Sequence, residues 1–389
     1  MIQIQTPQGW KQKPLKGVAE IERQGIQPDH ISPDAYYVGL EHVDGEGNFI
    51  AVQDAQSAEL KSTKFAFSDK HILYGKLRPY LRKISRPEFS GVCSTDILPI
   101  RPKNGLERDY LFHYLRQQRL VDFATARCTG INLPRLSPTA LAEFPVIYPD
   151  SPNEQKRIAA ILDKADAIRR KRRQALDLAD QFLRSVFLDM FGDPVTNPKG
   201  WQVQRFENLG VLARGKSKHR PRNAAELLGG PFPLIQTGDV ANANHFITSH
   251  SQTYSELGLQ QSKMWPAGTL CITIAANIAD TAILQFDSCF PDSVVGFTPS
   301  ELVKTEYIHM WLTFYQAILK EKAPESAQKN INLRILSELL IPTPPIADQE
   351  RFCRAFLEVE QLKDKFRQGA DGVEDTFSSL TQRAFRGEL

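Results

Sequence analysis

An internal repeat with a period of about 195–200 residues constrains the fold of this 389-residue chain more than any other feature. Ile131-Asn132-Leu133 recurs as Ile331-Asn332-Leu333, and Leu and Ser follow both copies. A proline-containing exit comes next, and then an acidic residue beside glutamine opens a long helical pattern, at Glu154-Gln155 and at Asp348-Gln349. A chain built as globule, helix, globule, helix has two similar working surfaces, so its ligand should also have two parts.

The repeat divides the chain into four segments, predicted at 1–150, 151–193, 194–346 and 347–389. Residues 154–191 form one long helical pattern that stops at a Gly and Pro exit, Gly192-Asp193-Pro194. From Ile158 to Val186 its apolar residues recur at heptad spacing, which is typical of a helix that packs along another helix. A second such pattern begins at Phe352. The apolar stripe of each long helix needs a partner, and the simplest partner is the other copy. We therefore expect the two long helices to pack antiparallel.

The two globular segments contain short strand patterns with turn residues between them. Tyr36–Leu40 is followed by an Asp-Gly turn and a second apolar run, a hairpin signal. In the second copy Leu234–Val240 matches Tyr37–Val43, and Val240–Ile247 matches Val43–Ile50. Further along, Trp265–Ile272 aligns with Ile72–Pro79, and Thr273–Asn277 with Tyr80–Ile84. The predicted fold class is α+β: two α/β domains separated by two long antiparallel helices that form a coiled-coil spacer, with a pseudo-twofold internal repeat.

Composition predicts a soluble globular protein, with 41% hydrophobic and 24% charged residues and a formal net charge of +3. There is no apolar run of membrane-spanning length, and the first residues lack the apolar core of a secretory signal. The five cysteines are scattered singly. We therefore expect reduced thiols in a cytoplasmic protein without structural zinc.

One segment fits a phosphate-loop motif. Gly210–Ser217 matches G-x-x-x-x-G-K-[ST] letter for letter. A true phosphate loop follows a buried strand and opens a helix, whereas Pro221 comes soon after Ser217 and disfavours a regular helix. The first copy has no such motif, which weighs against nucleotide binding there.

A nuclease-like motif is equally short. Glu59-Leu60-Lys61 fits the Glu-x-Lys of many nucleases, but the second copy keeps Glu256-Leu257 and lacks the lysine. The Asn/Asp-Pro-Pro-aromatic motif of amino-methylating DNA enzymes is missing from the sequence. An enzyme built on either weak motif is the least favoured hypothesis.

Each globular segment has its own basic cluster free of acidic residues, which is a better guide to function than the mild net charge. Such clusters are commonly a solvated edge strand or a flexible loop, whereas the interleaving of basic with aromatic and apolar residues favours DNA contact. The first basic cluster comprises Lys76, Arg78, Tyr80, Arg82, Lys83 and Arg86, and the second comprises Arg214, Lys216, Lys218, Arg220 and Arg222.

Polar turns precede a short helix in both copies. Their asparagines either cap the helix or offer side chains to a duplex, and both interpretations stay open. Arg169–Arg173, in the middle of the first long helix, is either solvated surface or a patch for DNA phosphates or a partner subunit. The candidate DNA contacts in these turns and in the Thr273–Asn277 segment are Asn132, Arg135, Asn277, Lys329, Asn330 and Asn332.

The whole chain resembles the specificity subunit of type I restriction–modification systems. The resemblance lies in Leu73–Tyr80, in Gly130–Leu133, in the two proline-rich exits that lead to a glutamine-containing helix entry, and in the tail Gln382–Leu389. In that family two target-recognition domains alternate with two helical conserved regions. The recurrence of the exit and helix entry makes the resemblance specific, although each short motif alone is common.

The resemblance implies a subunit without catalytic activity that binds a bipartite, asymmetric site on double-stranded DNA. The antiparallel helices would set the spacing between the two half-sites. The implied partners are two modification subunits, which use S-adenosylmethionine to methylate adenine, and restriction subunits, which use ATP. No cofactor is expected on this chain, and S-adenosylmethionine, ATP and Mg²⁺ belong to the partners. A stand-alone, sequence-specific DNA-binding regulator is the alternative.

Overall fold

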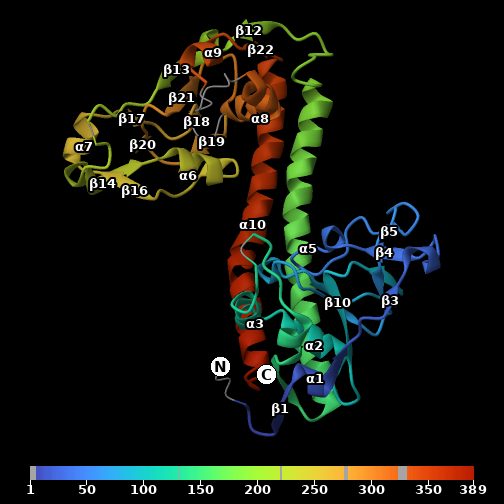
Figure 1. Cartoon of the computed structure of the whole chain (residues 1–389). Helices are drawn as coiled ribbons and strands as arrows, with labels where there is room; N and C mark the ends of the chain where they lie inside the picture. The colour runs from blue at the N-terminus through green and yellow to red at the C-terminus, as the bar shows by residue number, and fades with distance from the viewer. Residues whose placement is uncertain (1–5, 131, 220, 276–278, 323–330) are drawn as a thin grey trace. The chain divides into compact units, whose positions relative to one another are not determined.

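The chain folds into two compact units in the computed structural model (Figure 1). The structure describes residues 6–130, 132–219, 221–275, 279–322 and 331–389, with the backbone alone at 321–322 and 368–376. Unit 1 comprises Met1–Arg172 together with Gln368–Leu389, and unit 2 comprises Arg173–Arg367. Each unit thus contains one globular segment and part of each long helix.

The described residues of unit 1 form three sheets. Strand β1 (Trp10–Pro14) pairs antiparallel with β11 (Pro145–Pro149). A four-stranded sheet has the order β2 (Ala19–Ile21), β10 (Ile97–Pro102), β7 (Ile72–Gly75), β8 (Ile84–Ser85). A five-stranded sheet has the order β3 (Gly25–Ile26), β6 (Lys64–Phe67), β9 (Gly91–Cys93), β4 (Tyr36–Val38), β5 (Gln53–Asp54). The α-helices of the globular segment are α1 (Leu15–Val18), α2 (Arg108–Leu115), α3 (Gln118–Thr125) and α4 (Pro138–Ala142).

Unit 2 repeats this plan. Strand β12 (Val203–Arg205) pairs antiparallel with β22 (Leu340–Pro342). One sheet has the order β13 (Gly210–Arg214), β21 (Val294–Pro299), β18 (Leu270–Thr273), β19 (Thr281–Leu284), β15 (Phe246–Ile247). The other has the order β16 (Gln252–Tyr254), β14 (Leu228–Leu234), β20 (Ser288–Cys289), β17 (Met264–Trp265). The helices of the globular segment are α6 (Thr237–Asn242), α7 (Glu256–Gln260), α8 (Thr305–Lys322) and α9 (Leu333–Ser337).

Strand pairing confirms the internal repeat. In unit 1, β10 lies between β2 and β7 and is antiparallel to both, as β21 is to β13 and β18 in unit 2. Strand β4 pairs parallel with β9, and β14 pairs parallel with β20. The α+β class and the repeated two-domain plan are therefore correct.

The predicted register of the repeat is wrong at two places. Asn332 caps α9 and accepts a hydrogen bond from the Ile335 amide, whereas α4 is capped by Ser137. Each helix leads after the same number of residues into the strand that pairs with β1 or β12, so Asn332 corresponds to Ser137 and not to Asn132. Likewise the sequence alignment matches Trp265 with Ile72, but Trp265 lies in β17. The true counterpart of Ile72 in unit 2 is Leu270 of β18. The short identical peptides do not occupy equivalent positions of the two units. Strand pairing, which is independent of such matches, fixes the true equivalence.

The two long helices are α5 (Pro152–Phe191) and α10 (Ile346–Ala384). In unit 1 Arg157 of α5 donates to the Leu389 carbonyl at 2.9 Å, while Arg169 lies over the Phe377 ring at 5.5 Å, so the segments run antiparallel. In unit 2 Phe187 packs against Phe352 with ring centroids 5.4 Å apart, and the order is again antiparallel. None of the described helices has the length and apolar character needed to cross a membrane.

A buried glutamine fixes the start of each long helix. The Gln155 side chain accepts from the Glu107 amide and donates to the Gly105 and Pro149 carbonyls. Gln349 makes the same three bonds in unit 2. Both residues are fully buried. The acidic-residue-plus-glutamine pattern recurs because this side chain satisfies three backbone groups where the globule meets the helix.

Candidate nucleic-acid interface

The loop between β7 and β8 carries most of the first basic cluster in an unusual backbone conformation. Arg78 and Arg82 have left-handed φ angles of 51° and 52° and flank a short 3₁₀ turn, Pro79–Leu81. Such angles are uncommon for residues other than glycine, and the surrounding contacts must enforce them. Here the Gly75 amide donates to the Lys83 carbonyl at 2.8 Å, and the Arg78 amide to the Pro134 carbonyl at 2.8 Å.

This loop lies against the polar turn that precedes α4. The Leu136 amide donates to the Lys76 carbonyl at 2.9 Å, and Leu77 forms a bridge with Arg135. Asn132 and Arg135 are exposed beside the loop. The structure thus brings together two segments that are over 40 residues apart in the sequence, each predicted separately to contact DNA.

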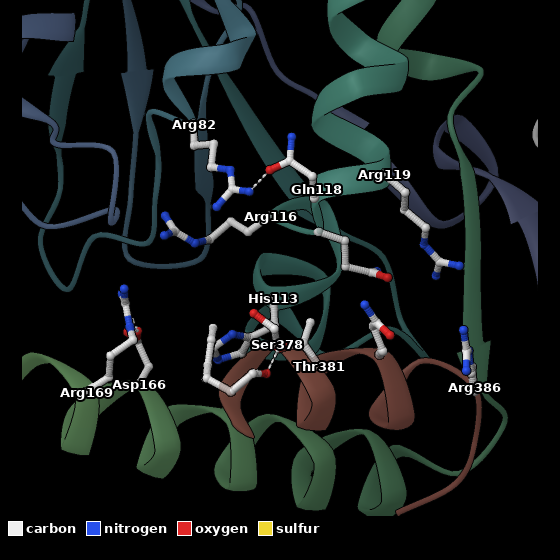
Figure 2. Close-up of a pocket in the computed structure, with 13 residues that line it drawn as sticks. Arg82, His113, Arg116, Gln118, Arg119, Asp166, Arg169, Ser378, Thr381 and Arg386 are labelled. Atoms are coloured by element: carbon white, nitrogen blue, oxygen red, sulfur yellow. Dashed lines mark hydrogen bonds and ion pairs between the residues drawn. The ribbon is translucent and has the colours of Figure 1, made fainter. Parts of the chain in front are cut away.

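Several side chains of the first basic cluster have partners within unit 1. Asp96 lies 3.6 Å from Lys76 Nζ and 3.3 Å from Arg135 Nε. Lys83 Nζ donates to the Leu40 carbonyl at 2.6 Å. Arg82 is half-buried and donates to Gln118 (Figure 2).

Arg78 and Tyr80 are the exposed members of the first basic cluster whose side chains have no hydrogen-bond partner among the described residues. A guanidinium and a phenol held on a rigid turn can reach phosphates or base edges. These two residues are therefore the strongest candidates in unit 1.

Unit 2 builds the same arrangement from different residues. The Thr273 amide donates to the Asp280 carbonyl at 2.9 Å, and the Ile331 amide to the Ile274 carbonyl at 3.1 Å. Ala279 has a left-handed φ of 57°, as Arg82 does in unit 1. The loop between β18 and β19 is thus equivalent to the β7–β8 loop and lies beside the turn before α9.

The predicted contacts of this second surface fall largely outside the described residues. These are Asn277, Lys329 and Asn330, together with Arg220 of the second basic cluster. Asn332 is exposed, and its Oδ1 accepts from the Ile335 amide at 2.9 Å. Its helix-capping role is therefore confirmed, and its contact with DNA stays a prediction.

The second basic cluster occupies another part of the frame. It follows β13, where Arg214 Nε donates to the Asp292 carbonyl at 2.8 Å and Arg222 pairs with the Asp292 carboxylate. Lys216 and Lys218 are exposed. The corresponding position in unit 1 follows β2, so the two basic clusters are not equivalent surfaces.

The phosphate-loop hypothesis is wrong. Gly210–Arg214 is strand β13 itself, paired along its length with β21. In the described residues no α-helix begins near Ser217, and the next helical turn is Ala225–Leu227. A helix N-terminus, which supplies the amides that hold phosphates, is therefore missing there.

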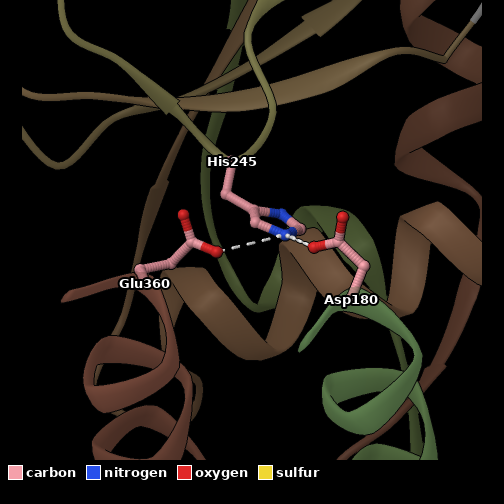
Figure 3. A group of neighbouring side chains, drawn as sticks. All are labelled: Asp180, His245 and Glu360. Carbon is pink, nitrogen blue, oxygen red and sulfur yellow. Dashed lines mark ion pairs between the residues drawn. The ribbon is translucent and has the colours of Figure 1, made fainter. Parts of the chain in front are cut away.

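One charge cluster was not predicted from the sequence. His245, in the loop before β15, lies between the long helices of unit 2, with Nε2 3.5 Å from Asp180 Oδ1 and 3.6 Å from Glu360 Oε1 (Figure 3). Lys363, nearly fully buried, pairs with both carboxylates, at 2.6 Å from Glu360. The acids and the imidazole are spaced closely enough to hold a metal ion. The lysine ammonium already occupies the cation position, so the cluster is a structural ion-pair network.

The protonation of this network follows from its burial. Burial would raise the pKa of Asp180, but hydrogen bonds from His245 and Lys363 outweigh it and lower the pKa to about 2. His245 Nδ1 lies 2.8 Å from Nε2 of His309, which is fully buried. Burial, with the charges of His245 and Lys363, holds the pKa of His309 well below 6.5, so this ring is neutral.

In unit 1 the equivalent loop, Val43–Ile50, contacts α5 through the basic segment Arg169–Arg173. Arg169 Nη1 lies 3.2 Å from Glu46 Oε1, and Arg170 donates to Asn48 Oδ1 at 2.6 Å. Arg169 also pairs with Asp166 at 2.8 Å. For these two arginines the solvated-surface interpretation is wrong, because they fasten the Val43–Ile50 turn to the helix.

Known proteins share both the sequence pattern and the fold. The family model for the type I restriction modification DNA specificity domain matches residues 7–178 and 198–366, once in each half. The EcoDI specificity subunit of a type I restriction enzyme of Escherichia coli is 26% identical over 194 residues, which are 49% of this chain and 43% of that subunit. This alignment spans less than half of that relative's length.

A second relative aligns along the whole chain. The putative MjaX specificity subunit of Methanocaldococcus jannaschii is 19% identical over 410 residues, covering 98% of this chain and 94% of that protein. The solved S subunit of a type I system from M. genitalium superposes with a TM-score of 0.66 at 12% identity, over 99% of this chain and 98% of that one. A chain from a structure of type I restriction–modification complex assembly gives a TM-score of 0.55 at 19% identity, over 99% and 100%.

The family model covers both halves, the structural neighbours share the fold, and the internal repeat is present in strand order and in helix entry. The chain belongs to the type I restriction–modification DNA specificity family.

Proposed function

We propose that this chain is the DNA-reading subunit of a type I restriction–modification complex, and that it recognises a bipartite, asymmetric site on double-stranded DNA. Unit 1 reads one half-site through the β7–β8 loop and the turn before α4. Unit 2 reads the other through the equivalent loop and turn. The non-specific bases between the half-sites correspond to the spacing that the long helices set.

One observation carries the proposal: the two units present unlike side chains at equivalent positions of one frame. The unit 1 loop exposes Arg78 and Tyr80, whereas the equivalent loop of unit 2 has the buried Ala279 at the left-handed position that Arg82 takes in unit 1. Recognition of two different base sequences requires such a difference, because discrimination comes from side chains at base edges.

We further propose that the chain catalyses no reaction and works with two modification subunits and with restriction subunits. S-adenosylmethionine, ATP and Mg²⁺ would bind to those partner subunits. The relatives named above are specificity subunits of type I restriction enzymes, which supports the assignment of partners.

Methylome sequencing of the host tests the proposal directly. Deleting this gene should remove one bipartite adenine-methylation motif, and restoring it should return the same motif. An unchanged methylome, together with tight DNA binding by the isolated chain, would instead support the stand-alone regulator.

Arg78→Ala tests the assignment of the reading loop. If Arg78 contacts a guanine edge, the complex should lose about 1–3 kcal/mol of binding free energy at one position of one half-site. Competition binding with single-base variants of the site measures this loss. Arg205→Ala, an exposed arginine of β12 outside the predicted contacts, is the matched control. Equal affinity and specificity of both variants and the unaltered protein would remove Arg78 from the interface.

A further inference from the structure

Unit 1 encloses a cavity of about 410 Å³ that the proposed function does not use (Figure 2). Its walls come from the junction of α2 and α3, from the middle of α5 and from the last turns of α10. All of its lining residues belong to unit 1. Its size is within the range of small-molecule sites.

Positive charge dominates the lining. It includes one aspartate, Asp166, and five arginines: Arg82, Arg116, Arg119, Arg169 and Arg386. Asp166 is already paired with Arg169 at 2.8 Å and with Arg170 at 3.2 Å. Burial lowers the pKa of His113, which also lines the cavity, so its ring adds no charge at neutral pH. The cavity is therefore an electropositive pocket.

Arg119, at the wall of the cavity, has guanidinium nitrogens without an acceptor. Its Nε and Nη2 atoms are inaccessible to solvent and have no hydrogen-bond partner in the described part of the chain. Its guanidinium lies 5.9 Å from the centroid of the Tyr114 ring. Buried guanidinium nitrogens without an acceptor are costly. Arg119 lines the cavity, so a rotation of its side chain would bring these nitrogens to an anion bound there.

The start of α3 lies at the same wall. Gln117 is the N-cap of this eight-residue helix, but its side chain makes no capping bond. The Gln117 amide group instead donates to the Tyr114 carbonyl at 2.9 Å, at the end of α2. Gln118 and Arg119, the first residues of α3, line the cavity. A helix N-terminus beside arginines favours a phosphate group.

The arginines are not a requirement of the repeated frame. In unit 2, Ala279 takes the position of Arg82. Thr313 takes the position of Arg116, because each follows by one helical turn an equivalent buried residue, His309 in unit 2 and Phe112 in unit 1. The cavity of unit 2 that Ala279 and Thr313 line is smaller, about 150 Å³, and His245 and His309 also line it. The same fold is thus built without this pocket.

We propose that the unit 1 pocket binds a compound with two or more phosphate groups, such as inorganic pyrophosphate or a nucleoside diphosphate. Figure 2 shows Arg82 and Arg116 at one side of the pocket and Arg119 and Arg386 at the other. Two separated arginine pairs match two anionic groups, and guanidinium binds phosphate through paired hydrogen bonds. The ligand takes part in no reaction and so differs from the cofactors expected on the partner subunits. The proposal does not depend on DNA recognition.

Isothermal titration calorimetry of the full chain without DNA tests this site. The probes are pyrophosphate, ADP and ATP, with orthophosphate and succinate as comparisons. Pyrophosphate or ADP should saturate one site per chain, and Arg119→Gln and Arg386→Gln should each weaken binding about tenfold or more. Arg334→Gln, which removes the same charge from an exposed position in unit 2, should leave binding unchanged. Pyrophosphate binding as tightly as ADP would assign recognition to the phosphates alone, whereas tighter binding of ADP would assign a nucleotide.

Thermal unfolding of the same variants separates ligand binding from folding. Without ligand, Arg119→Gln should be as stable as the unaltered chain or more stable, because an unpaired buried charge is removed. The stabilisation by pyrophosphate should be lost. The proposal is overturned if no phosphate compound gives saturable binding at millimolar concentration, if succinate binds as tightly as pyrophosphate, or if Arg334→Gln weakens binding as much as both pocket variants do.

Discussion

The two units fasten the same loop to the long helices with opposite charges. In unit 1 the loop offers a carboxylate, Glu46, to Arg169 on the helix. In unit 2 it offers an imidazole, His245, to Glu360 and Asp180, and Lys363 completes the network. The backbone arrangement is retained although the charges are exchanged. The frame therefore requires each buried charge to be matched locally, and it does not require a particular residue.

The largest expected effect comes from breaking the more buried network. Lys363→Met should destabilise unit 2 by about 3–5 kcal/mol, because the buried Glu360 loses its nearest counter-charge, and Arg367 at 3.5 Å does not replace it. Urea unfolding followed by tryptophan fluorescence measures this, since Trp201, Trp265 and Trp311 all lie in unit 2. The double change Lys363→Met with Glu360→Gln should recover part of the loss.

Lys304→Met is the matched control for that experiment. The Lys304 side chain is partly exposed and pairs with the exposed Glu350 at 2.9 Å, so its replacement should leave the midpoint nearly unchanged. If Lys363→Met behaved like this control, the buried network would contribute nothing to stability.

A second effect should be the same in both units. Gln155→Leu and Gln349→Leu each remove three hydrogen bonds and leave buried backbone groups without partners. We expect a loss of about 3 kcal/mol for each. Hydrogen exchange of the helix entries, read unit by unit, distinguishes the two. Gln174→Leu on the exposed face of α5 is the control, and a harmless Gln155→Leu would show that the glutamine is not a shared part of the frame.

The pH dependence of unit 2 should be steeper than that of unit 1, because Phe112 of unit 1 occupies the place of His309. Burial also lowers the pKa of His113 in unit 1, but its hydrogen bond with Asp163 opposes that shift. The folded pKa of His309 lies well below 6.5, so the unfolded chain takes up a proton that the folded chain does not. His309 therefore does not reduce the free energy of unfolding above pH 6.5, and it reduces that free energy as the pH falls below 6.5. The loss is up to about 1.4 kcal/mol at pH 5.5. Unfolding midpoints from pH 7.5 to 5.5 should fall less steeply in His309→Gln, and equal slopes would contradict the neutral buried ring.

The smallest effect tests the corrected register of the repeat. Ser137→Ala and Asn332→Ala should each cost about 1 kcal/mol, since each side chain caps a short helix. Asn132→Ala should change stability little, because Asn132 is exposed in the turn. A cost for Asn132→Ala equal to that for Asn332→Ala would instead restore the pairing that the sequence suggests.

Much of the fold follows from the sequence pattern. The first long helix is predicted at 154–191 and found at Pro152–Phe191, because heptad spacing and a Gly-Pro exit are local signals. The glutamine at each helix entry is visible as a recurrent letter. Two of its three hydrogen bonds are not visible, since their donors and acceptors lie some 45–50 residues away.

The candidate site was only partly predictable. The first basic cluster and the turn before α4 were each identified, but nothing local to either shows that Arg78 bonds to Pro134. His245 and Lys363 were missed. A lysine and a glutamate within the apolar stripe of a helix are the only signal for that network, and their partners come from other elements.

The sequence by itself determined the repeated frame, the two long amphipathic helices and the family, because periodicity and recurrent motifs are properties of the chain read in order. Only the tertiary structure decided the register of the two copies, the meeting of loop and turn in each unit, and the arginine-lined pocket of unit 1. Those features depend on buried hydrogen bonds and charges whose partners are distant in sequence, and packing alone brings such groups together.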